Sequence, residues 1–134
     1  SGVYDLTAQK DHEIKQGWND ISPMTAANGF TMERLEKNSP IKILQKHSQS
    51  PIEVTRNAIP PTLLLHGKDD GVAPPQSSKM LYEALQQQNP STRMQDQIEL
   101  LDGVGHEDPV VETTVGGPTQ SIIFQWLESV IEKA

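Results

Sequence analysis

The chain has 134 residues, of which 34% are hydrophobic, and a formal net charge of −7. This length is that of one ordinary domain. The acidic balance with scattered lysines and arginines argues against a nucleic-acid surface, and the lack of cysteines excludes disulfides and thiolate metal sites. No apolar segment approaches the roughly 18 residues of a membrane span, and the first residues do not resemble a signal peptide. We therefore expect a soluble protein; the composition leaves its compartment open, the cytoplasm included.

The first part of the chain predicts little sheet. Residues 1–6 (SGVYDL) suggest the end of a strand, and their abrupt start suggests that the chain belongs to something longer. Residues 7–57 show no strand alternation, so we expect an excursion of short helices and loops, or a cap, between two strands. Within it, the pattern predicts a helix over residues 30–37. A second helix is expected to begin at Pro40, with Ser39 as its N-cap.

The most informative stretch is IPPTLLLHGKDDGVAPP, residues 59–75. Its prolines block any helix arriving from upstream, because each fixes φ and lacks an N–H. The apolar run over residues 62–65 then predicts a strand buried on both faces of a parallel sheet. A polar turn follows this strand, so ionisable side chains lie where open α/β sheets place their chemistry.

The remainder alternates between helix and strand. Apolar residues at three- and four-residue spacing predict a helix over about residues 76–88, and residues 96–101 predict the next strand. Residues 115–118 are expected to form a loop, and Pro118 to open a final helix with Trp126 in the core. The order is strand, helical excursion, strand, helix, strand, helix. This order predicts a three-layer α/β/α fold with parallel strands.

Two loops carry the candidate chemistry. One follows the strand at residues 62–65 and contains Asp69 and Asp70; the other is Gly103-Val104-Gly105-His106. If the two strands are adjacent and parallel, these loops lie side by side. A carboxylate could then accept a hydrogen bond from the imidazole of His106, fix its tautomer and stabilise its protonated form during general-base catalysis.

Each of these residues also has a structural explanation. Asp-Gly is common turn chemistry, and a single loop histidine need not be catalytic. His66, at a strand end, suits a buried structural role, and His12 and His47 are expected to be exposed. Glu107 and Asp108 next to His106 could suggest a metal site, but no helical His-x-x-x-His or comparable set supports one. The order and spacing of the two loops together are more specific than either loop.

That combination resembles the C-terminal half of an α/β-hydrolase. His-Gly-x-x-Asp-x-x-Ala-Pro over residues 66–74 is similar to the acid loop of that superfamily, and Gly-x-Gly-His over residues 103–106 to its histidine loop. Residues 1–6 resemble the strand after the nucleophile helix in the esterase/lipase branch, closest to prenylcysteine methylesterases, kynurenine formamidases and carboxylesterases. The resemblance covers essentially all of residues 1–134, most securely 59–134. It implies Asp70, rather than Asp69, as triad acid and His106 as general base.

The resemblance further implies a serine hydrolase that cleaves carboxylic esters or related acyl bonds without a cofactor or metal. The sequence contains no Gly-x-Ser-x-Gly elbow and no His-Gly-Gly oxyanion loop; serines lacking the required context are Ser1, Ser77, Ser78 and Ser121. We therefore expect residues 1–134 to be one portion of a single hydrolase domain. The nucleophile-bearing N-terminal half, or another chain, would be their partner, and residues 1–134 alone would be inactive. The alternative is a non-catalytic hydrolase-like module used for protein interaction.

Overall fold

A computed structural model describes residues 2–48, 59–88 and 93–132. The elements in chain order are α1 (Leu6–Gln16), η1 (Asn19–Ile21), α2 (Pro23–Asn28), α3 (Met32–Asn38), α4 (Pro40–Ser48), β1 (Leu63–Gly67), α5 (Gln76–Gln86), β2 (Gln97–Leu101), α6 (Asp108–Val115) and α7 (Pro118–Ile131). In the part of the chain that is described, no helix is both long and apolar enough to cross a membrane.

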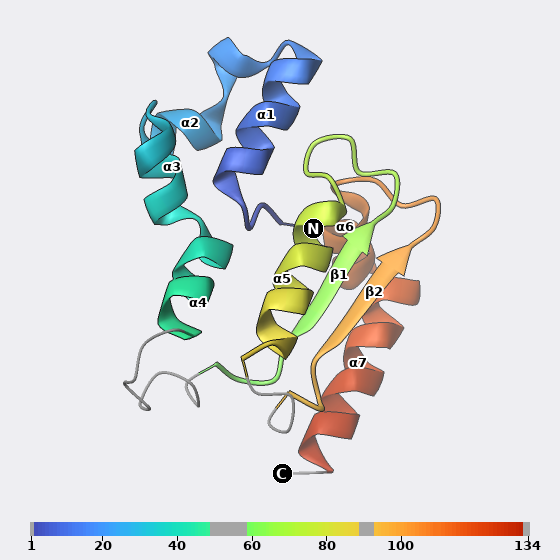
Figure 1. The fold of residues 1–134 in the computed structure, drawn as a ribbon. Coiled ribbons are helices and arrows are strands. Elements are labelled where there is room, and N and C mark those ends of the chain that lie inside the picture. Colours follow the sequence, from blue (N-terminus) through green and yellow to red (C-terminus); the bar gives the residue numbers. More distant parts are fainter. Residues whose placement is uncertain (1, 49–58, 89–92, 133–134) are drawn as a thin grey trace.

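The two described strands form a parallel pair in which Leu64 lies opposite Ile98 and Gly67 opposite Leu101. Helix α5 covers one face of this sheet, and α6 and α7 cover the other, which gives three layers (Figure 1). The predicted α/β/α layering and parallel pairing are therefore observed. Because parallel strands end on the same edge, the loops after Gly67 and Leu101 leave the sheet side by side.

Helices α1 to α4 form a separate column on the far side of α5 from the sheet (Figure 1). The described part of the excursion is helical, as expected, and α4 begins at Pro40. The side chain of Ser39 has a different task from the predicted cap: its Oγ accepts from Leu6 N and donates to Leu35 O. Ser39 thereby joins the start of α1 to the end of α3.

The prediction that residues 1–6 form the end of a strand is wrong. Residues 2–5 have no regular structure, and Asp5 instead caps α1 by accepting from Thr7 N at 3.0 Å and Ala8 N at 3.1 Å. Gly17 ends the same helix in the left-handed conformation, with φ of 76°. The helix depends on these two caps because its sequence has little apolar periodicity.

Two further expectations need correction. Strand β1 is buried on only one face: Leu64 and His66 are buried, whereas Leu63 and Leu65 are partly covered. They line an open groove with Trp126, which is therefore half-buried and not a core residue.

Helix α6 was not predicted, because eight residues with two adjacent threonines show no clear helical period.

A buried ion pair holds the sheet at the end opposite the two loops. Arg93 Nε donates to Asp96 Oδ2 at 2.5 Å, and its Nη1 donates to Ile59 O at 2.8 Å. Asp96 Oδ1 accepts from Thr62 N at 2.9 Å. These bonds tie the segment entering β1 to the segment entering β2, and they satisfy both buried charges.

Candidate active site

The two polar loops after β1 and β2 are in direct contact. Lys68 N donates to Leu101 O at 2.8 Å, and Asp69 N donates to Val104 O at 3.1 Å. Gly67 makes this approach possible, because a Cβ added there would lie 2.0 Å from Val104 O. Glycine at this position therefore lets the backbones of the two loops touch.

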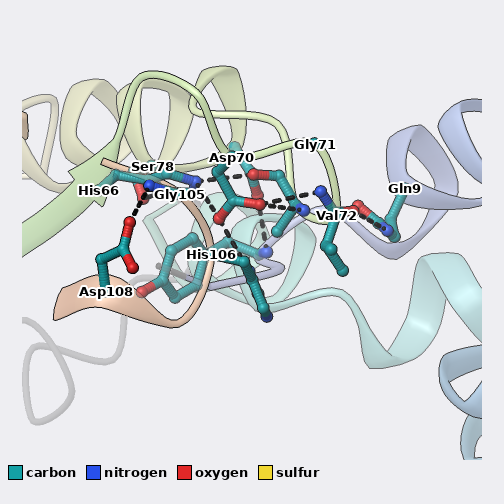
Figure 2. A network of polar contacts seen from close by, with 12 residues as sticks. Gln9, His66, Asp70, Gly71, Val72, Ser78, Gly105, His106 and Asp108 are labelled. Carbon is teal, nitrogen blue, oxygen red and sulfur yellow. Dashed lines mark hydrogen bonds and ion pairs between the residues drawn. The ribbon is translucent and has the colours of Figure 1, made fainter. Parts of the chain in front are cut away.

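Asp70 lies buried between the loops, as Figure 2 shows. Its Oδ1 accepts from Val72 N at 2.9 Å and from Ala73 N at 2.8 Å, and its Oδ2 accepts from His106 Nδ1 at 2.8 Å. Burial by itself would raise the pKa of this carboxyl, but the hydrogen bonds from Ala73, His106 and Val72 outweigh it and lower the pKa. Asp70 is therefore ionised near neutral pH and can only accept.

This arrangement determines the tautomer of His106. Because Asp70 is an acceptor, the proton of the neutral ring lies on Nδ1, and Nε2 carries a lone pair. The side chain is 39% exposed, and the ring extends away from Asp70 (Figure 2). Beside it is an open depression of about 400 Å³ lined by His106, Glu107, Val110 and Val111. Nε2 is thus available to take a proton from a group approaching from outside.

The histidine loop is held by the start of the next helix. Asp108, in the first turn of α6, accepts from Gly105 N at 2.7 Å through Oδ2. A carboxylate at this position also suits the positive end of the helix. The sequence pattern suggested Asp108 only as part of a metal site, whereas in the fold it fixes the backbone that carries His106.

His66 is the buried structural histidine expected from its position at the strand end. Its side chain is 0% exposed, and its ring nitrogens face Ser78 Oγ at 2.6 Å and Ala73 O at 2.7 Å. Nε2 also lies 3.2 Å from Asp70 Oδ2. Burial lowers the pKa of His66, although the bond to Ala73 O and the nearby Asp70 oppose this effect, so the ring is neutral.

Helix α1 supports the acid loop from its other side. Gln9 Nε2 donates to Val72 O at 2.9 Å, and His12 Nε2 donates to Gly71 O at 2.9 Å. His12 is partly buried, which corrects the expectation that it is exposed. Neither contact was foreseen, because they span 63 and 59 residues of sequence and no local pattern announces them.

The remaining candidates are not at the Asp70–His106 pair. The side chain of Asp69 is exposed, and Ser78 is buried against His66. Ser77 Oγ accepts from Tyr4 N at 2.8 Å, and Ser121 lies in α7. The side chain of His47 lies outside the described part of the structure. Among residues 2–48, 59–88 and 93–132, no three His, Asp or Glu side chains cluster as metal ligands would.

Comparison with known proteins places the chain in a family. Comparisons with curated proteins and with solved structures gave no match. Residues 2–114 match the prolyl oligopeptidase family, a family of α/β-hydrolase fold. The match spans both loops, from His66 to His106, and most of the chain, and it supports a serine hydrolase. The chain therefore belongs to the prolyl oligopeptidase family of α/β-hydrolases.

Proposed function

We propose that Asp70 and His106 are the acid and the general base of a serine hydrolase that cleaves acyl bonds. The observation that carries this proposal is the 2.8 Å bond from His106 Nδ1 to Asp70 Oδ2, made by a buried carboxylate and a half-exposed ring. The acid is thereby shielded from water while the base remains accessible. This is the division of roles that acyl transfer requires of these two groups.

The geometry supports a defined sequence of proton transfers. A serine hydroxyl approaching His106 Nε2 would give up its proton to that nitrogen as its oxygen attacks the substrate carbonyl carbon. The ring then carries a positive charge, which Asp70 stabilises across the Nδ1–H bond. The same proton passes from Nε2 to the leaving group, so His106 returns to its neutral form. A water molecule then attacks the acyl-serine while His106 takes its proton. The bond between the acyl group and the serine breaks, His106 returns the proton to the serine oxygen, and the acid product leaves.

Within the acyl substrates, the family match favours a peptide bond, and the resemblance of the loops favours a carboxylic ester. We propose a peptide amide as the physiological class, since the match extends over residues 2–114. The same residues would also cleave activated esters, because esters need less assistance to expel their leaving group. Rates on a matched amide and ester of one acyl group would separate these two classes.

We propose further that the nucleophilic serine and oxyanion donors come from a partner segment outside residues 1–134. The sequence has no Gly-x-Ser-x-Gly to supply the serine. The groove along β1, of about 620 Å³, has a largely apolar lining, and Leu127 and Ile131 of α7 are exposed. Apolar surface of this kind suits contact with further parts of a sheet protein.

Helices α1 to α4 would serve as part of a substrate-facing cap. Support comes from the contacts of Gln9 and His12 with the acid loop, which place α1 at the same edge of the sheet as Asp70. Loops and helices at this edge commonly set specificity in α/β proteins. Shortening the segment 24–30 should change substrate preference more than thermal stability. Extensive unfolding with unchanged preference would contradict this role.

The test uses the native full-length protein that contains this chain and a fluorophosphonate probe, which reacts with a serine activated by a histidine. We expect labelling of one serine outside residues 1–134, and its loss in the His106→Ala variant. Asp102→Asn is the matched control, because this side chain is 85% exposed at the start of the same loop. Absence of labelling in the native protein would reject the hydrolase and favour a protein-interaction module. Labelling that survives in His106→Ala would reject the assignment of the base.

A further inference from the structure

A second histidine lies on the other side of the Asp70 carboxylate from His106 (Figure 2). His66, on β1, is fully buried and reaches two parts of the structure at once. Nδ1 is 2.6 Å from the hydroxyl of Ser78 in α5, and Nε2 is 2.7 Å from Ala73 O in the acid loop. Nε2 is also 3.2 Å from Asp70 Oδ2, the oxygen that accepts from His106.

The partners of His66 determine where its proton lies. Ala73 O and the ionised Asp70 are both acceptors, so Nε2 must carry the hydrogen. Nδ1 is then an acceptor, and the hydroxyl of Ser78, 1% exposed, donates to it. The opposite tautomer would aim a lone pair of Nε2 at two oxygens. Ser78 favours the required tautomer by satisfying Nδ1, which would otherwise be a buried acceptor without a donor.

We propose that His66 and Ser78 are positioning residues that hold Asp70 in line with His106. Ala73 links His66 to Asp70, because its N–H donates to Asp70 Oδ1 while its carbonyl accepts from His66. His66 therefore restrains both the backbone of the acid loop and the carboxylate within it. The kinetic part of this inference rests on the proposed function, whereas its structural part does not.

Removing the hydroxyl of Ser78 should loosen this restraint without touching the reacting groups. In Ser78→Ala, the buried Nδ1 of His66 loses its donor, and the ring can shift or exchange tautomer. Asp70 then loses its fixed orientation toward His106. We expect kcat to fall by on the order of 10- to 100-fold, the range for residues that orient a reacting group without touching the substrate. KM should change little.

The experiment compares Ser78→Ala with Ser77→Ala in the native full-length protein. Ser77 lies one residue away in the same helical turn and bonds Tyr4 N, so its loss removes a hydroxyl without touching His66. Imidazole ¹⁵N spectra report the protonated nitrogen of each histidine independently of turnover. We expect wild-type His66 to carry its proton on Nε2, and only Ser78→Ala to alter the His106 Nδ1–H signal. Glu107 and Asp108, the charged neighbours of His106, remain unchanged in both variants.

The outcomes are distinguishable. A proton on Nδ1 of wild-type His66 would overturn the proposal, as would a His106 signal in Ser78→Ala identical to that in Ser77→Ala. Equal kcat values for the two variants would also overturn it. If the native protein neither hydrolyses substrate nor reacts with the probe, the proposed function fails. The ¹⁵N spectra then still decide whether His66 and Ser78 position Asp70.

Discussion

Replacement of Gly67 by alanine tests whether the contact between the two loops holds the Asp70–His106 pair together. The added Cβ would lie 2.0 Å from Val104 O, whereas ordinary contact begins at 3.4 Å, so a shift of about 1.4 Å is needed. The histidine loop must supply most of this shift, because Gly67 is held in the β1–β2 pair opposite Leu101, whereas the clashing backbone atoms belong to the loop residues Val104 and Gly105. Such a shift would take His106 Nδ1 out of hydrogen-bond range of Asp70 Oδ2, now 2.8 Å away.

Two magnitudes follow from this displacement. Overpacking of this kind costs about 1–3 kcal/mol of stability. A misplacement of about 1 Å in a catalytic group costs on the order of 10²-fold in rate. The effect on activity should therefore exceed the effect on stability, and it should appear in kcat more than in KM.

The assay measures hydrolysis and thermal unfolding of Gly67→Ala and Gly71→Ala in the native full-length protein. Gly71 is in the same loop, but a Cβ there would meet no atom within 4 Å, so it is the matched control. We expect near wild-type values for Gly71→Ala and a loss of about 10²-fold for Gly67→Ala. Wild-type activity in Gly67→Ala, or equal losses in both variants, would refute the reasoning.

Three further predictions concern charged and titratable side chains. Asp70→Asn should lower turnover by on the order of 10⁴-fold, because His106 would lose control of its tautomer, while Asp69→Asn should have a mild effect. If steady-state kinetics show the larger loss for Asp69→Asn, the catalytic acid is Asp69 and not Asp70. Because burial lowers the pKa of His66, the unfolded chain binds more protons below its ordinary value of 6.5, so stability falls as pH drops below that value. Thermal melts should show this slope, at most about 1.4 kcal/mol per pH unit, and a His66→Gln variant should lack it; equal slopes would contradict the assignment. Arg93→Met should lower the free energy of unfolding, measured by chemical denaturation, by about 3–5 kcal/mol, because Asp96 is left as an unpaired buried charge. The double variant Arg93→Met/Asp96→Asn should recover part of this stability. No recovery would mean that lost packing, and not the unpaired charge, causes the loss.

Several elements could be predicted because their signals are local. Prolines and an apolar run define the entry and the body of β1, and Pro40 and Pro118 mark the starts of α4 and α7. Helix α1 shows the opposite case. Its capping residues, Asp5 and Gly17, were present in the sequence, but its weak apolar periodicity hid the helix, and a strand was expected just before it.

The candidate site was likewise predictable only in part. The spacing of its two loops along the chain was enough to indicate His106 and a carboxylate of the acid loop, because parallel strands bring their carboxyl ends to one edge. The choice of Asp70 over Asp69 came from the resemblance to the α/β-hydrolase acid loop. The sequence did not indicate that Ser78, Gln9 and His12 would surround the acid loop. Their contacts join residues 12, 63 and 59 positions apart, and such contacts exist only after α1 and α5 have packed.

Residue type and order alone determined the parallel α/β arrangement and the two ionisable side chains that face each other at its edge. Those properties follow from local rules: proline geometry, apolar periodicity and the direction of parallel strands. The tertiary structure decided which aspartate is buried, because Asp69 and Asp70 are equivalent as turn residues and only packing against Ala73 and His106 separates them. It also decided the protonation of His66 and His106, since a tautomer depends on which acceptors lie within hydrogen-bond distance of each ring nitrogen, and chain order does not encode those distances.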